Sequence, residues 1–182
     1  RKRRSMGTMT GTDSAIAPGG TVGILGGGQL GRMLALAAAQ LGLKCAIYAP
    51  EADSPAFQVS AWHVVADYGY HKALADFARR VDVVTYEFEN VPGDAASVLS
   101  ALRSVRPNPK ALVVIQDRLA EKSFLRDQSI ATAPFAPVTS DESLRAAARS
   151  IGVPSVLKTA RLGYDGKGQR MVRTAAQRCL VW

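Results

Sequence analysis

Residues 157–169 contain the side chains best suited to binding an anion. The apolar run 153–157 ends at Lys158, and a glycine-rich loop with a second lysine, Lys167, follows within a few residues. Closely spaced glycines let backbone N–H groups approach an anion without obstruction, and lysines supply positive charge for a polyphosphate. The loop is not a Walker A motif, because Gly168 rather than Ser or Thr follows Lys167. It is interpreted either as a phosphate loop or as a polar hairpin whose turns are shaped by Gly163, Gly166 and Gly168.

A second glycine-rich loop, near the N-terminus, favours the phosphate interpretation. Residues 22–25 have a β-type pattern and lead into Gly26-x-Gly28-x-x-Gly31. An amphipathic helix is predicted next, with Gly42 at its C-terminal cap. Its apolar residues at helical spacing are Leu30, Met33, Leu34, Ala37 and Leu41. A strand, a glycine turn and a helix N-terminus together present free N–H groups and partial positive charge to a phosphate.

The same glycine pattern occurs in NAD-binding domains, but a second feature of those domains is missing. A dinucleotide site needs an acidic residue at the end of the second strand. Here the second predicted strand, 44–48, runs into Ala49-Pro50, and the first carboxylate, Glu51, lies beyond the proline. NAD binding is therefore the weaker interpretation.

Carboxylates and an amide follow another predicted strand. Residues 81–86 form an apolar, β-branched run typical of a buried parallel strand, and Glu87-Phe88-Glu89-Asn90 comes directly after it. Open α/β sheets bind ligands at the carboxyl ends of their strands. Glu87 and Asn90 are therefore candidate ligand contacts, although charges at a helix N-terminus or in a solvated loop would give the same pattern.

The rest of the chain first alternates strands with helices and then changes character near residue 130. The alternation predicts strands at 61–65 and 105–107, and helices at 72–80, 95–103, 110–116 and 117–127. Beyond two prolines, Thr139-x-x-Glu142 predicts a capping box for a helix that ends at Ile151 and Gly152. A hairpin of 155–159 and 169–172 follows. Because two strands alone are marginally stable, this second unit is expected to be incomplete and to expose apolar faces.

Composition and charge exclude several classes of protein. An apolar content of 47% with 21% charged residues argues against disorder, and no apolar run is long enough to span a bilayer. The net charge is +8, but Arg1-Lys2-Arg3-Arg4 accounts for half of it, so residues 1–20 are interpreted as a disordered leader rather than a nucleic-acid-binding tail. No signal peptide is visible. Cys45 and Cys179 lack metal or redox spacing, which favours a reducing cytoplasm.

From Thr21 to Arg173 the sequence resembles the 5-(carboxyamino)imidazole ribonucleotide synthases, the ATP-grasp ligases of purine biosynthesis. The resemblance rests on four segments in order, at 26–33, 86–92, 116–122 and 157–169. Other ATP-grasp enzymes, such as biotin carboxylase, share the strand lysine and glycine loop but are not expected to share the first two segments. The implied fold class is α/β: after the leader 1–20, a Rossmann-like (pre-ATP-grasp) parallel-sheet domain at 21–128, then the beginning of an ATP-grasp α+β domain, truncated, at 129–182.

The resemblance also implies roles for individual residues. The expected catalytic residues are Tyr164, Asp165 and Lys167. The expected ATP-binding residues are Arg118, Lys158, Gly163, Tyr164, Asp165, Gly166, Lys167, Gly168 and Gln169. The expected substrate-binding residues are Gly26, Gly28, Gln29, Leu30, Gly31, Glu87 and Asn90. No metal ligand is expected within the chain.

The reaction implied by the resemblance uses ATP and Mg²⁺ to phosphorylate bicarbonate, and the resulting carboxyphosphate carboxylates 5-aminoimidazole ribonucleotide. A cytoplasmic homodimer without nucleic-acid or membrane partners is implied as well. The family continues well beyond this sequence, including its metal-binding acidic residues, so the chain is expected to be a truncated fragment that is inactive alone. Two alternatives stay open: an NAD-dependent oxidoreductase fragment, and a non-catalytic phosphate-binding or interaction module.

Overall fold

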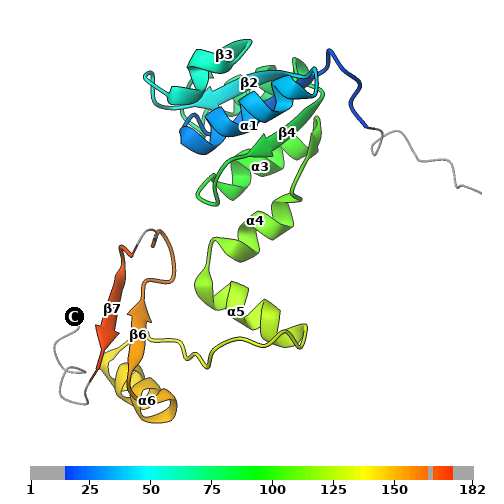
Figure 1. Ribbon diagram of the computed structural model, residues 1–182. Coiled ribbons are helices and arrows are strands. Elements are labelled where there is room, and N and C mark those ends of the chain that lie inside the picture. Colours follow the sequence, from blue (N-terminus) through cyan, green and yellow to red (C-terminus); the bar gives the residue numbers. More distant parts are fainter. Residues whose placement is uncertain (1–14, 164–165, 174–182) are drawn as a thin grey trace, which may run out of the picture. The chain divides into compact units, whose positions relative to one another are not determined.

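The computed structural model describes residues 15–163 and 166–173, and the chain divides into two compact units (Figure 1). The first unit ends at Pro109 and the second begins at Lys110. Within the described residues, no helix is both long and apolar enough to cross a bilayer.

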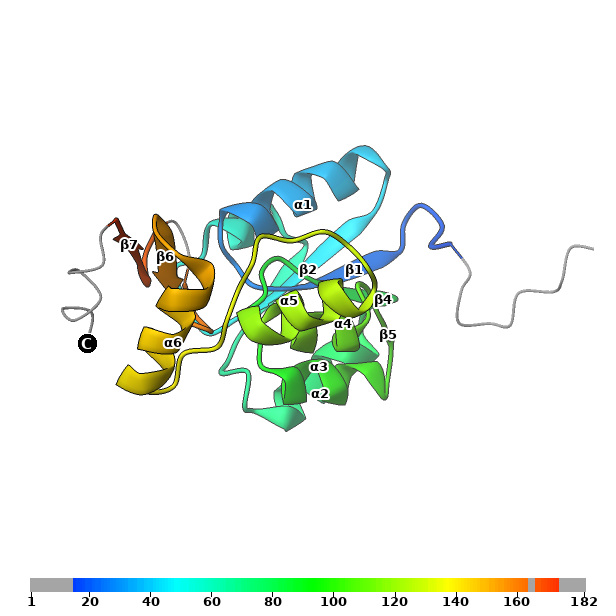
Figure 2. The same ribbon diagram turned by 90° about the horizontal axis from the view of Figure 1, so that it is seen from below.

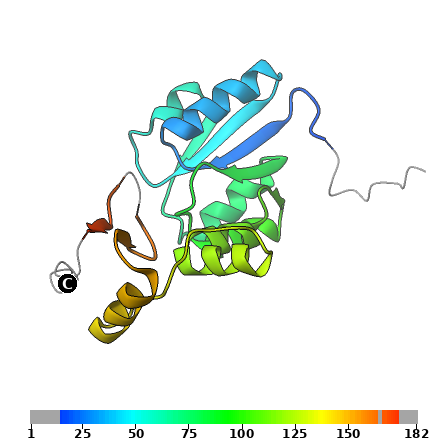
Figure 3. The same ribbon diagram turned by 60° about the horizontal axis from the view of Figure 1, so that its bottom comes forward.

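A five-stranded parallel sheet forms the centre of the first unit. Its elements are β1 Thr21–Leu25, α1 Gln29–Gln40, β2 Lys44–Ala49, the 3-10 helix η1 Pro55–Val59, β3 Trp62–Val65, α2 His71–Arg79, β4 Val83–Tyr86, α3 Gly93–Ser100 and β5 Ser104–Val105. The strand order is β3-β2-β1-β4-β5, with all neighbours parallel. Helix α1 covers one face, and α2 and α3 cover the other (Figures 2 and 3). This arrangement confirms the predicted α/β fold.

Small residues form the face of α1 that packs on the sheet. Gly31 and Ala35 are buried, and Ala35 belongs to a core cluster with Ile24 and Ile47. The amphipathic pattern predicted the helix correctly but not its buried face, because the large apolar residues point outward; Met33, for example, is 56% exposed. Branched side chains of the strands already fill the space beneath the helix, and a close-packed interior leaves room only for small residues opposite them.

The described part of the second unit contains helices and an antiparallel hairpin. The elements are α4 Pro109–Ile115, whose first residue is the last of the first unit, α5 Arg118–Asp127, α6 Asp141–Ile151, β6 Ser155–Lys158 and β7 Gln169–Val172. Val156 pairs with Met171 across the hairpin, and these side chains are 43% and 50% exposed, whereas Val172 is buried. The expectation that the hairpin exposes an apolar face is therefore confirmed.

Helix α6 begins one residue later than its predicted capping box. Ser140 is the N-cap: its hydroxyl accepts from the Ser143 N–H at 3.2 Å, and the Ser143 hydroxyl accepts from the Ser140 N–H at 2.9 Å. The predicted pair of Thr139 with Glu142 was wrong, because two short serine side chains satisfy both N–H groups locally. The predicted end of the helix is confirmed, since Gly152 follows Ile151 with a φ of +84°.

Candidate functional site

One side chain joins the end of β4 to the start of α1. The strand order reverses between β1 and β4, where Leu25 pairs with Tyr86, so the loops after these strands begin side by side. Glu87 comes next, and its carboxylate accepts hydrogen bonds from the N–H groups of Gly28, at 2.8 Å, and Gly31. The first N–H groups of a helix have no intrahelical acceptor. Glu87 therefore occupies, from within the protein, the anion position at the N-terminus of α1.

The glycines of the first loop leave space for the Glu87 side chain. Gly26 has a φ of +105°, and a Cβ there would lie 2.5 Å from Glu87 Oε1. A Cβ on Gly28 would lie 3.0 Å from the same oxygen. A Cβ on Gly31 would lie 2.9 Å from Oε2 and 2.7 Å from the Gly26 carbonyl oxygen. Contact with a carboxylate of the same chain thus accounts for the glycine pattern without a phosphate.

Gln29 and Leu30 are the remaining first-turn residues that a ligand could contact. Both are exposed, and their N–H groups lie in the turn where an α-helix has no intrahelical acceptors. Because Glu87 bonds Gly28 and Gly31, ribonucleotide binding at this loop depends on Gln29 and Leu30, or on displacement of the Glu87 carboxylate. The predicted substrate contacts stay predictions.

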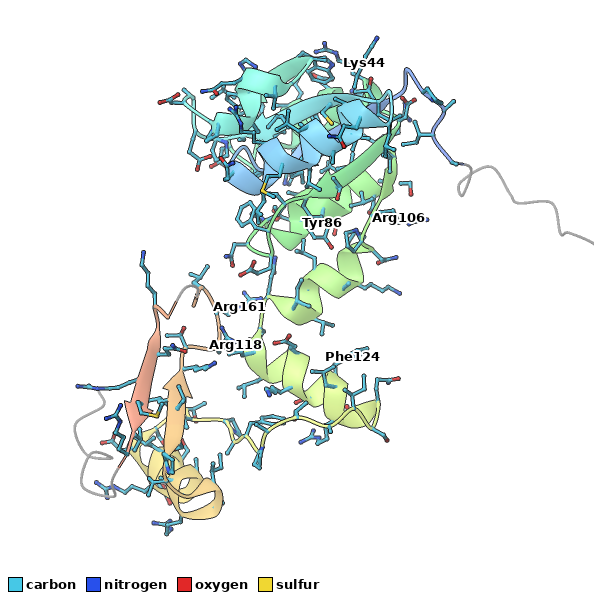
Figure 4. All side chains as sticks on the ribbon, in the orientation of Figure 1. Lys44, Tyr86, Arg106, Arg118, Phe124 and Arg161 are labelled. Atoms are coloured by element: carbon cyan, nitrogen blue, oxygen red, sulfur yellow. The ribbon has the colours of Figure 1, made fainter. Side chains whose placement is uncertain are left out.

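Tyr86 is a polar residue beside this loop that was not among the predicted site residues. Its side chain is 9% exposed, and within the described residues its hydroxyl has no hydrogen-bond partner (Figure 4). Burial raises the pKa of Tyr86 and keeps the hydroxyl protonated at neutral pH. In the sequence, its position as the last residue of a predicted strand is the feature that could have identified it. Asn90, which the sequence did single out, donates a 3.4 Å hydrogen bond to Glu89.

In the second unit, the start of α5 is tied to the loop after β6. The Arg118 guanidinium donates to the Gly163 carbonyl oxygen at 3.1 Å, and the Arg118 backbone N–H donates to the Ala160 carbonyl at 2.9 Å. Asp117 caps α5 and lies 3.7 Å from the Arg161 side chain (Figure 4). Two segments predicted to contact ATP, 45 residues apart in sequence at Arg118 and Gly163, therefore meet.

Lys158 lies at the end of β6, where its side chain is exposed and its register partner is Gln169. The Thr159 N–H donates to the Gly168 carbonyl at 2.8 Å and closes the base of the loop. Gly166 and Gly168 have φ values of +78° and +67°, so turn geometry explains both glycines. Lys167 is exposed on the same loop. The remaining predicted loop residues, Tyr164 and Asp165, lie outside the described residues.

Comparison with known families identifies the domain that contains the first of these loops. Residues 20–116, more than half of the chain, match the ribonucleotide synthetase preATP-grasp domain. The chain belongs to this family. Residues 123–182 match the ATP-grasp domain. In the preATP-grasp domain, the glycine loop and Glu87 both lie within the matched range, as does the sheet whose strand order reverses beside them.

Several relatives of this preATP-grasp protein are N5-carboxyaminoimidazole ribonucleotide synthases. The N5-carboxyaminoimidazole ribonucleotide synthase of Brucella melitensis is 51% identical over 156 residues, which are 86% of this chain and 43% of that protein. A solved synthetase of this name in complex with ADP has a TM-score of 0.84 and 42% identity, and the match covers 88% of this chain and 43% of that one. The Aspergillus clavatus synthase, solved with ADP and 5-aminoimidazole ribonucleotide, has a TM-score of 0.76 and 28% identity, covering 90% and 43%.

These comparisons confirm the resemblance stated from the sequence, and they also define its extent. The chain spans 43% of the length of each of these relatives. The activity, substrates and partners of the whole relatives are therefore carried over to this chain as proposals.

Replacing Glu87 with glutamine is expected to lower the free energy of unfolding of the first unit by about 1–3 kcal/mol. The carboxylate accepts one N–H on each of its two oxygens, whereas the glutamine amide has only one acceptor oxygen. Urea denaturation followed by circular dichroism measures the change. Glu51→Gln is the matched control, since Glu51 is exposed in the same unit, and its effect should stay within about 0.5 kcal/mol. Equal stability of the two variants would show that the Glu87 bonds contribute nothing.

Proposed function

We propose that the chain carries the ribonucleotide-binding domain and the first ATP-binding elements of an N5-carboxyaminoimidazole ribonucleotide synthase, a ligase of purine biosynthesis. Bicarbonate oxygen attacks the γ-phosphorus of ATP and ADP leaves. The exocyclic amine of 5-aminoimidazole ribonucleotide then attacks the carbon of carboxyphosphate, losing a proton as inorganic phosphate leaves. Family membership and the names of the relatives support this proposal.

The structural observation that carries the proposal is the hydrogen bond from Arg118 to Gly163. It joins the start of α5 to the glycine loop, so a cation and a loop of backbone N–H groups lie together. A guanidinium has five N–H donors, and one bond to a carbonyl leaves others for a phosphate. In the proposal, Arg118 holds the loop in place and contacts ATP through its remaining donors.

We place ATP on the exposed face of the β6–β7 hairpin. Val156 and Lys158 share one face of β6 because side chains alternate along a strand, and Met171 pairs with Val156 on the same face. The two apolar side chains suit a nucleobase, and Lys158 suits its phosphates. Lys167, on the loop, then balances charge at the γ-phosphate, and the backbone N–H groups of Gly163, Gly166, Gly168 and Gln169 are proposed to donate to its oxygens. Tyr164 and Asp165 are proposed to contact ATP from the same loop.

The ribonucleotide is assigned to the loop between β1 and α1. The N–H groups of Gln29 and Leu30, beside the partial positive charge of the helix, suit the ribonucleotide phosphate. Glu87 and Asn90, at the end of β4, are proposed to supply polar groups for the ribose or the amine. Gly26, Gly28 and Gly31 would be open to the ligand only after the Glu87 carboxylate is displaced. This assignment requires only the first unit.

The remaining parts of the proposal concern ions, location and assembly. No three His, Cys, Asp or Glu side chains gather at a possible metal position anywhere in residues 15–163 and 166–173. The described residues thus offer no fit for Mg²⁺, whose ligands are proposed to lie outside this chain. Bicarbonate as co-substrate, a cytoplasmic location and a homodimer stay predictions.

Isothermal titration calorimetry tests the nucleotide assignment. The 182-residue chain is expected to bind ADP and ATP but not NAD⁺, and Lys158→Ala should weaken ADP binding about 10- to 100-fold, as for the loss of one charged hydrogen bond. Lys44→Ala, at an exposed lysine of the first unit, is the control and should bind as the unsubstituted chain does.

Two other outcomes would overturn the proposal. Binding of NAD⁺ without ADP would support an oxidoreductase. Binding of neither nucleotide would support a non-catalytic module.

A further inference from the structure

The stem of the second glycine loop, which runs from Ala160 to Gly163, is fastened to the start of α5 at three points. The Ala160 carbonyl accepts from the Arg118 backbone N–H at 2.9 Å, and the Gly163 carbonyl accepts from the Arg118 guanidinium at 3.1 Å. Between these two bonds, Arg161 Nε lies 3.7 Å from Asp117 Oδ2 (Figure 4). Two consecutive residues at the start of one helix therefore contact three of the four residues of the loop stem.

Leu162, the remaining residue of the loop stem, has a backbone conformation that leucine rarely adopts. Its φ is +61°, in the left-handed region that is costly for a residue with a Cβ. Its side chain is 72% exposed, so packing of that side chain does not explain the conformation. A backbone of this kind persists where the surrounding structure holds it. The contacts of Arg161 and Gly163, on either side of Leu162, supply that support.

The Asp117 carboxylate divides its two oxygens between the helix and the loop stem. Oδ1 accepts from the N–H groups of Leu119, at 2.9 Å, and Ala120, at 3.1 Å, and so caps α5. Oδ2 faces the Arg161 guanidinium. Asparagine caps a helix as well as aspartate does, so the cap alone does not require a charge. The negative charge of Asp117 is needed for the contact with Arg161.

We propose that Asp117 is a positioning residue for ATP, because through Arg161 it holds the loop stem in the conformation that brings Gly163 to Arg118. This inference rests on the proposed function, since it concerns the loop assigned there to ATP. The bond to Gly163 fixes the direction of the Arg118 guanidinium and of the donors that it has left for a phosphate. Without the Asp117 contact, Leu162 would relax to a negative φ, the Gly163 carbonyl would turn, and Arg118 would lose its anchor.

A double-mutant cycle on the 182-residue chain, measured by calorimetric titration with ADP, tests this role. Asp117→Asn keeps an oxygen for the cap and removes the charge, and Arg161→Gln removes the other charge without touching the cap. Each variant should weaken ADP binding about three- to fivefold, as for one partly exposed ion pair. The double variant should bind ADP no more weakly than either single variant. Arg161→Lys, which keeps the positive charge, should bind ADP as the unsubstituted chain does.

Hydrogen exchange of the Arg118 N–H, measured by NMR without nucleotide, gives a readout that does not depend on binding. The first N–H groups of a helix have no intrahelical acceptor, so the Ala160 carbonyl is the acceptor that protects this one. Its exchange should become about three- to fivefold faster in Asp117→Asn and in Arg161→Gln, and should stay slow in Arg161→Lys.

Asp127→Asn is the matched control. It makes the same change of charge at the other end of α5, where Asp127 Oδ1 lies 3.5 Å from Arg126 Nε and both side chains are exposed. ADP affinity and the exchange of the Arg118 N–H should both be unchanged in this variant. Circular dichroism checks that every variant is folded.

The possible results separate this inference from the proposed function. If the unsubstituted chain binds ADP and Asp117→Asn changes neither ADP affinity nor Arg118 exchange, the positioning role is wrong and the proposed function stands. Tighter ADP binding in Asp117→Asn, or a further loss in the double variant, would show that Arg161 contacts the nucleotide itself and would overturn the role as well. A chain that binds no ADP at all would overturn the proposed function and, with it, the role of Asp117.

Discussion

Replacing Gly31 with alanine is expected to lower the free energy of unfolding of the first unit by about 3 kcal/mol, through overpacking and the loss of a charged hydrogen bond. The new Cβ would lie 2.7 Å from the Gly26 carbonyl oxygen, which belongs to the backbone and cannot rotate away. It would also lie 2.9 Å from Glu87 Oε2, the atom that accepts the Gly31 N–H. Urea denaturation monitored by circular dichroism measures the loss.

Gly28→Ala is the matched control, because its Cβ would approach only the Glu87 side chain, at 3.0 Å at the nearest. Its smaller cost should disappear in a Glu87→Ala background, where that side chain is gone. The cost of Gly31→Ala should remain in the same background, since the Gly26 carbonyl is unchanged. If Glu87→Ala rescued both glycine substitutions equally, the backbone contact would not be the cause.

The second large effect is expected for the two lysines of the proposed ATP site, in a protein of the full length of the relatives. Lys158→Ala should lower kcat/KM for ATP about 100-fold and should weaken ATP binding as well, because a strand-held lysine contacts the bound nucleotide before reaction. Lys167→Ala should lower kcat by a similar factor but change ATP affinity little, because its loop is proposed to close on the γ-phosphate during transfer.

Steady-state kinetics combined with ADP titration separates the two roles. Lys110→Ala, in α4 and outside both proposed loops, serves as the control and should leave both quantities unchanged. If both variants lost ATP affinity and turnover to the same extent, the separate roles of Lys158 in binding and Lys167 in transfer would be wrong. If neither variant lost affinity or turnover, the loop would not be part of the ATP site.

The sequence predicted the elements of this protein well because each has a local signal. The apolar run 81–86 and the alternation around it predicted the buried strand β4 and its neighbours, and the glycine after Ile151 marked the end of α6. The inward face of α1 was not predictable by the same reasoning. Its hydrophobic pattern is real, but it points away from the sheet, and choosing the buried face requires knowing how much space the strands leave.

The candidate sites were predicted less completely than the fold. Sequence identified both glycine loops and the carboxylate Glu87, yet it gave no indication that Glu87 binds the first loop, because that contact joins residues 59 apart at Gly28. A glycine pattern has the same appearance whether a ligand or a side chain of the same chain lies against it. The buried hydroxyl of Tyr86 was missed for a similar reason, since its lack of a partner depends on packing rather than on sequence.

The bond between Glu87 and the first loop also constrains the order in which this domain can be built. Glu87 lies after four strands, so the chain has to be made through β4, and β4 has to dock beside β1, before the start of α1 acquires its anionic partner. Closing so long a loop is entropically costly and is repaid only when the sheet assembles. The proposed ribonucleotide site therefore cannot form before the sheet does. During synthesis, the first glycine loop is made early, but it reaches its final structure only after β4 and Glu87 have been made and β4 has paired with β1.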